Sequence, residues 1–81
     1  AISSGMIPDE TLDARGLLCP LPVLKLRKRL KSLGPGAEIA MQADDPAAVI
    51  DVPHFCAESG HTLVSATETD GIQTYVIRKI G

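Results

Sequence analysis

Apolar and polar residues alternate with two different periods along the chain, and the changes of period divide it into six short elements. Between residues 20 and 33 the apolar side chains fall at helical spacing, at Val23, Leu26, Leu30 and Leu33. Lysines and arginines cover most of the rest of that segment, which predicts an amphipathic helix packed on a second layer.

Turn-forming residues set the bounds of the elements in the first half of the chain. A strand is expected at Glu10–Ala14, closed by Arg15-Gly16, and the first helix is expected to begin with Pro20, which suits a first helical position. Gly34-Pro35-Gly36 stops that helix, and a second strand is expected at Ala37–Ala43.

The second helix is placed by Pro53, because proline is tolerated best in the first turn of a helix. The main helix is therefore expected to begin near Asp51 and to end at Gly60. A separate single turn is expected before it, at residues 47–50.

Two runs rich in β-branched residues close the chain, at His61–Thr67 and Ile72–Ile80. Between them lies Asp70-Gly71, a dipeptide favoured in hairpin turns. The resulting order β-α-β-α-β-β predicts an α/β (α+β) two-layer sandwich, in which both helices cover one face of a four-stranded mixed sheet.

Length and composition fit one small domain. The chain has 81 residues, of which 44% are hydrophobic and 22% charged, a globular composition. Residues 6–81 are expected to form the domain, and residues 1–5 are interpreted as a remnant of an expression sequence or a disordered start. No apolar run approaches the roughly 20 residues that span a bilayer, so the chain is expected to be cytoplasmic and without membrane contact. It is also expected to be a monomer.

Two cysteines are too few for a disulfide framework, so each is assessed as a free thiol. Cys19 precedes the first helix, where unpaired backbone N–H groups favour the reactive thiolate. With Cys19 as N-cap, Pro20 and Pro22 occupy helical positions but have no N–H, which leaves the Leu21 N–H as the donor to the sulfur. The alternative is that Cys19 is simply a small buried residue at a loop-to-helix junction. This is disfavoured because a residue with only a structural role at a helix N-cap is usually Ser, Thr, Asp or Asn.

The remaining thiol and the two histidines have plainer interpretations. Cys56 lies one turn beyond Val52 on the predicted buried stripe of the second helix, so it is expected to pack in the core. His54 and His61 are interpreted as a helix-surface residue and a strand-start residue. No spacing typical of a zinc site links them to the cysteines, and neither a metal nor a cofactor is expected.

The segment around Cys19 resembles the N-terminal signature of the TusA/SirA-like family of sulfur-carrier proteins, in the run Leu12-Asp13-Ala14-Arg15-Gly16-Leu17-Leu18-Cys19-Pro20-Leu21-Pro22-Val23. The resemblance continues at Asp44-Asp45-Pro46, at Asp51-Val52-Pro53-His54-Phe55-Cys56 and at Gly60-His61. It implies the sandwich fold and a sulfurtransferase-type covalent carrier. Its Cys19 would accept sulfane sulfur as a persulfide from a desulfurase- or rhodanese-type donor protein and pass it to an acceptor protein.

By the same resemblance five residues would support that cysteine: Asp13, Arg15, Gly16, Pro20 and Pro22. Arg15 would either stabilise anionic sulfur or pair with Asp13. The family's tRNA-thiolation carrier has Glu between the two prolines, where this chain has Leu21. The pathway is therefore left open among tRNA thiolation, cofactor assembly and sulfur-compound oxidation.

Five of the eight Lys and Arg residues lie between Lys25 and Lys31. They form either a solvated face or a docking face for acidic partner surfaces, with Lys25 and Lys28 as the candidate docking residues. A net charge of −2 and the lack of an aromatic platform argue against direct nucleic-acid binding. A regulatory binding module and a thiol redox protein are the competing functions, and the absence of Cys-x-x-Cys disfavours the second.

Overall fold

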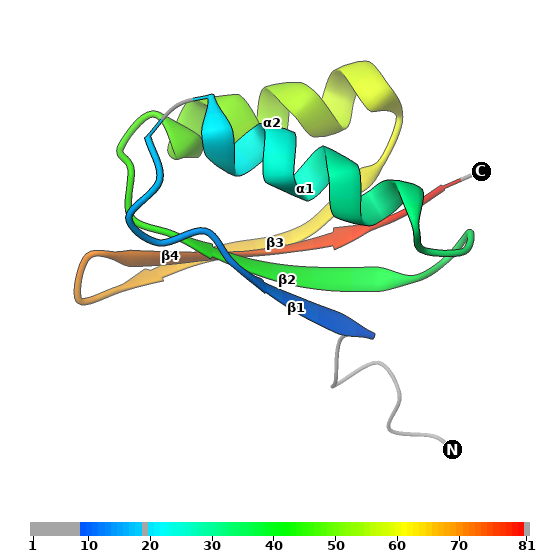
Figure 1. Cartoon of the computed structure of the whole chain (residues 1–81), viewed down its shortest axis with the longest axis horizontal. Helices are drawn as coiled ribbons and strands as arrows, with labels where there is room; N and C mark the ends of the chain where they lie inside the picture. The colour runs from blue at the N-terminus through cyan, green and yellow to red at the C-terminus, as the bar shows by residue number, and fades with distance from the viewer. Residues whose placement is uncertain (1–8, 19, 81) are drawn as a thin grey trace.

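The computed structural model describes residues 9–18 and 20–80, and its elements follow the predicted order (Figure 1). They are β1 (Glu10–Asp13), α1 (Leu21–Lys31), β2 (Glu38–Ala43), α2 (Ala48–Ser59), β3 (Thr62–Thr69) and β4 (Ile72–Arg78). The expectations for residues 1–5 and for the Cys19 side chain lie outside the described residues.

The four strands form one mixed sheet in the order β1-β2-β4-β3. β1 pairs with β2 in parallel, whereas β4 pairs antiparallel with both β2 and β3. Both helices cover the same face of this sheet (Figure 1). The predicted two-layer sandwich is therefore confirmed.

The core lies between the sheet and the two helices and consists mainly of aliphatic side chains. α1 contributes Leu26 and Leu30, and the sheet contributes Ile39, Met41 and Ile77, none of them more than 2% exposed. The predicted apolar stripe of the first helix is thus the side that faces the sheet. Burial of this stripe is the main force that holds α1 on the sheet.

Pro53 does not mark the beginning of the second helix. α2 runs through it without a break, so the predicted start near Asp51 and the separate turn at residues 47–50 are wrong. A proline at this position cannot donate the helical hydrogen bond to the carbonyl of residue 49, which costs the helix one bond. The first turn stays in line because three residues spaced four apart are buried against the core on one side of α2, namely Ala48, Val52 and Cys56.

The hairpin between β3 and β4 turns at Asp70 and Gly71, as predicted. Their φ angles are +54° and +80°, and positive φ at both central residues is what a two-residue type I′ turn requires. β3 is an edge strand whose pairing with β4 shifts by one residue between Leu63 and Ser65. In the described part of the chain neither helix has the length and apolar character to cross a bilayer.

Candidate functional site

The loop at residues 14–18 leads out of β1 and is attached to the sheet at its first residue. Ala14 is fully buried, and its N–H donates to the Gln42 carbonyl at 2.8 Å, which continues the parallel pairing of β1 with β2. The Leu17 N–H donates back to the Ala14 carbonyl at 3.3 Å and closes a turn. Gly16, inside this turn, has a φ of +81°, a conformation that glycine adopts without steric cost.

Side chains from two other elements also hold this part of the chain. Asp44, in the loop between β2 and α2, accepts a hydrogen bond from the Gly16 N–H at 3.0 Å through its Oδ1 atom. Lys25 of α1 donates from Nζ to the Asp13 carbonyl at 2.9 Å. The segment that precedes Cys19 is therefore joined both to the β2–α2 loop and to α1.

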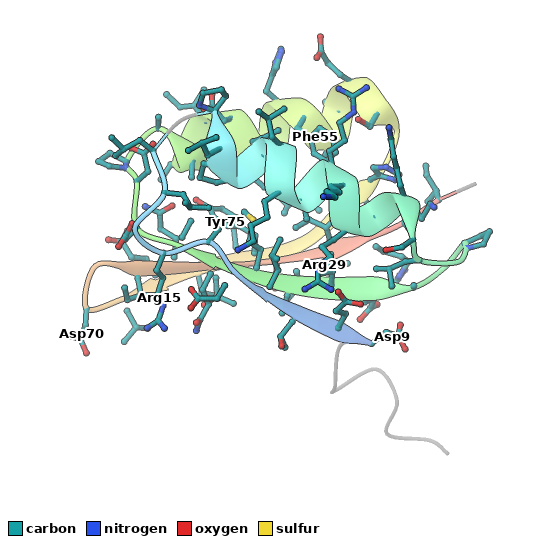
Figure 2. All side chains as sticks on the ribbon, in the orientation of Figure 1. Asp9, Arg15, Arg29, Phe55, Asp70 and Tyr75 are labelled. Carbon is teal, nitrogen blue, oxygen red and sulfur yellow. The ribbon has the colours of Figure 1, made fainter. Side chains whose placement is uncertain are left out.

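Asp13 and Arg15 form an ion pair, which is one of the two roles considered for Arg15. Arg15 Nε lies 2.9 Å from Asp13 Oδ1 and Nη2 lies 3.1 Å from Oδ2, while the Arg15 backbone N–H donates to Oδ1 at 3.1 Å. Figure 2 shows the Arg15 side chain pointing away from the helices. These hydrogen bonds, the side-chain ones first, hold the pKa of the Asp13 carboxyl at about 2.

The low pKa of Asp13 predicts a specific pH dependence. Because this pKa lies below its ordinary value of 3.8, the ion pair stabilises the fold above about pH 4 and its contribution is lost as the pH falls through about 2. Asp13→Asn should remove that part of the acid sensitivity in urea unfolding measured between these pH values. Arg15→Gln should raise the pKa of Asp13 in an NMR titration, and an unchanged pKa would contradict the pairing.

α1 begins one residue later than predicted. Pro20 is the N-cap, with φ −98° and ψ 16°, and its carbonyl accepts a helical hydrogen bond from the Leu24 N–H at 3.1 Å. The predicted Cys19 N-cap is therefore wrong, and the Leu21 N–H donates to the Leu18 carbonyl at 2.8 Å. This hydrogen bond closes a turn just before the helix, and in it the Leu18 carbonyl is the acceptor for the Leu21 N–H. Whether this N–H also serves the Cys19 sulfur lies outside the described residues.

The described residues on either side of Cys19 are exposed and mostly apolar. Leu18 is 71% exposed and Leu21 is 49% exposed, and Pro20 is exposed as well. Pro22, in the first turn of α1, is buried and anchors that turn. Of the described motif residues, Pro20 and Leu21 are therefore open to contact by another protein, and Pro22 is held in place at the beginning of α1.

Cys56 is buried in the core, and both histidines have a partner close by in the structure. Cys56 is 3% exposed, which confirms the prediction, and desolvation raises the pKa of its thiol, so the reactive thiolate is disfavoured. His54 Nε2 lies 3.4 Å from a Glu58 carboxylate oxygen, and His61 Nδ1 accepts a hydrogen bond from the Ile80 N–H at 3.3 Å. Within the described ranges no three His, Cys, Asp or Glu side chains gather as metal ligands.

Two of the basic residues of α1 contact β1. Lys25 binds the Asp13 carbonyl, and Arg29 pairs with the Glu10 carboxylate. Lys28 is exposed. Lys25 is thus a structural contact as well as a candidate docking residue.

The chain combines a β-α-β-α-β-β sandwich with a Cys-Pro-x-Pro sequence between its first loop and its first helix, the combination expected of the sulfur-carrier family that the sequence resembles. The chain matches the model of the sulfurtransferase TusA family over residues 10–79, and it belongs to that family. The crystal structure of the SirA-like protein from Desulfitobacterium hafniense is similar, with a TM-score of 0.79 and 26% sequence identity over 89% of this chain and 99% of that one. The predicted family is confirmed.

Proposed function

We propose that this protein is a sulfur carrier that accepts sulfane sulfur as a persulfide on Cys19 and relays it to an acceptor protein. Membership of the TusA sulfurtransferase family carries the proposal, because the Cys-Pro-x-Pro cysteine of this chain lies in the matched region. The exposure of Leu18 and Pro20 on either side of that cysteine supports it. So do the hydrogen bonds that fix the preceding loop, since transfer between proteins needs a reachable but rigidly supported thiol.

The chemistry is two successive exchanges of a sulfur–sulfur bond. In loading, the Cys19 thiolate attacks the terminal sulfur of a donor's persulfide, so that a new S–S bond forms on Cys19 and the donor leaves as a thiolate. In delivery, an acceptor thiolate attacks the terminal sulfur on Cys19, and Cys19 leaves as the thiolate. Each step replaces one S–S bond with another, so neither consumes an oxidant or a reductant.

The partners follow from this chemistry. The donor is a protein that forms a persulfide, of the desulfurase or rhodanese type, and the acceptor is a protein that presents a thiolate. Both must keep their thiols free between transfers, which is the condition of a reducing compartment such as the cytoplasm.

Intact-protein mass spectrometry after incubation with a persulfide-loaded donor tests the proposal. We expect a gain of one sulfur atom that peptide mapping places on Cys19, with Cys56 unmodified because it is buried. A disulfide between Cys19 and Cys56 would support a thiol redox protein instead. Sulfur found mainly on Cys56 would also contradict the proposal.

We further propose that the basic face of α1 docks acidic surfaces of the donor and acceptor. Lys28→Glu should slow transfer from the donor about tenfold at low salt, because charge complementarity acts mainly on the rate of association. The difference from the wild type should shrink as salt rises, since screening removes the attraction between exposed charges. Transfer rates would be measured across a salt series, and equal rates at low salt would contradict a docking role.

Two controls sharpen this test. Lys31→Glu makes the same charge change at the last residue of α1, farthest along the helix from Cys19, and should slow transfer less. The reactivity of Cys19 toward a small neutral thiol reagent should be the same in all variants. Lys25→Glu is a poorer probe because it also breaks the hydrogen bond to the Asp13 carbonyl.

A further inference from the structure

The Asp44-Asp45-Pro46 segment, between β2 and α2, makes hydrogen bonds to three other parts of the chain. Asp44 accepts from the Gly16 N–H at 3.0 Å. The Asp45 carbonyl accepts from the Ala48 N–H at 3.0 Å, which ties the segment to the beginning of α2. The same carbonyl accepts from the Gln73 amide nitrogen at 3.2 Å, which ties it to β4.

The connection to β4 is partly buried and leads to a buried hydrogen bond within that strand. Gln73 is 6% exposed and Tyr75 is 3% exposed, and the Tyr75 hydroxyl donates to the Gln73 amide oxygen at 2.5 Å. Since a carbonyl can only accept, the Gln73 amide nitrogen must face Asp45, and its oxygen must face the hydroxyl. Figure 2 shows Tyr75 between the sheet and the helices. The base of the Asp44 loop is therefore fixed from inside the molecule.

The loop at 14–18 lies beside the Asp44 loop at the same end of the molecule (Figure 1). β1 is a short edge strand, and the middle of the loop after it consists of exposed residues, Arg15 and Gly16. Arg15 and Gly16 therefore contribute little buried surface, whereas Ala14 before them is buried and Leu17 after them packs against the core. The bond from Gly16 to Asp44 connects the middle of this segment to a loop whose position the core determines.

We infer that Asp44 is a positioning residue for sulfur transfer, holding the Gly16 N–H, and with it the segment three residues before Cys19, through support from Gln73 and Tyr75. The inference rests on the proposed function of Cys19. Asp44 has no part in the bond exchange. It sets where the thiol is presented, and a shift of about 1 Å at a reacting atom can cost a large factor in rate.

The test compares Asp44→Ala with Asp44→Asn in single-turnover transfer from a persulfide-loaded rhodanese-type donor. Asp44→Ala should lower the maximal transfer rate about tenfold and leave the half-saturating donor concentration unchanged. Asp44→Asn keeps an acceptor oxygen and should retain most of the rate. Glu58→Ala, which removes one exposed negative charge from α2, should transfer like the wild type. Thermal melting should change little for Asp44→Ala because the hydrogen bond is exposed.

A second measurement does not depend on sulfur. Amide hydrogen exchange at Gly16 should accelerate in Asp44→Ala and stay near the wild-type rate in Asp44→Asn. Equal exchange at Gly16 in Asp44→Ala and the wild type would overturn the inference. If the wild type itself gains no sulfur, the proposed function fails, and the exchange result still decides whether Asp44 fixes this loop.

Three kinetic results would also overturn it. Wild-type maximal transfer by Asp44→Ala would show that the bond is dispensable. Equal slowing in Asp44→Ala and Asp44→Asn would mean that the negative charge matters rather than the held N–H. A raised half-saturating donor concentration at an unchanged maximal rate would assign Asp44 to docking.

Discussion

Replacement of Cys19 by serine should abolish sulfur loading and leave the fold intact. A serine hydroxyl is not ionised near neutral pH and forms no persulfide, so the loss should reach the background of the assay rather than a fraction of the rate. The fold should survive because the residues that flank position 19 are exposed and the core comes from other elements. Intact-protein mass spectrometry after incubation with the loaded donor measures the loss, and circular dichroism measures the fold.

Cys56→Ala provides the matched control, because it also removes one of the two thiols. Its stability should fall, since a buried side chain is truncated, while sulfur loading per folded molecule should be retained. Sulfur uptake by Cys19→Ser at the wild-type level would refute the assignment of Cys19. Loss of uptake in Cys56→Ala alone would transfer the role to the buried thiol.

Leu26→Ala should destabilise the fold strongly. Leu26 is 0% exposed and lies in the middle of α1, where it packs between the helix and the sheet. Truncation of a fully buried leucine costs about 2–5 kcal/mol of unfolding free energy, out of roughly 5–15 kcal/mol for a whole domain. Urea unfolding followed by circular dichroism should show the midpoint falling at an unchanged slope.

Leu24→Ala is the matched control for this change, on the same helix and two residues away. Leu24 is 50% exposed, so its truncation should cost well under half as much. Equal losses for the two variants would mean that α1 does not pack on the sheet through its Leu26 side. Leu24 is exposed and lies near the beginning of α1, the end of the helix next to Cys19. The rate of sulfur transfer to Leu24→Ala would therefore also show whether apolar contacts help donors to dock.

The elements of this fold could be predicted from the sequence where one local rule was sufficient. The spacing of Leu26 and Leu30 gave the buried side of α1, and Asp70-Gly71 gave the hairpin, because positive φ at two successive positions restricts the residues that fit. A local rule failed to predict where α2 begins, which is at Ala48. The rule that proline belongs in a first turn was overridden at Pro53 by the burial of residues on both sides of it.

The sequence pointed to candidate site residues, but it did not predict the hydrogen bonds that join them to other parts of the chain. The motif pointed to the segment around Cys19 and offered the Asp13–Arg15 pair as one of two roles for Arg15, and these residues are close in sequence. The bond from Asp44 to Gly16 joins residues 28 positions apart, and no local pattern reports such a contact. One signal was present: Gln73 is a polar residue at a position where the alternation of β4 calls for a buried side chain.

The burial of Cys56 has a consequence for the proposed carrier, because it would keep the second thiol of the chain away from a persulfide. A persulfide is lost when a second thiol attacks the inner sulfur, releasing sulfide and leaving a disulfide. The thiol of Cys56 is shielded from solvent and has a raised pKa, so it could attack only after part of the domain opened. On the proposed function, the lifetime of the persulfide would then depend on encounters with other proteins and with small thiols in the surroundings, and not on Cys56.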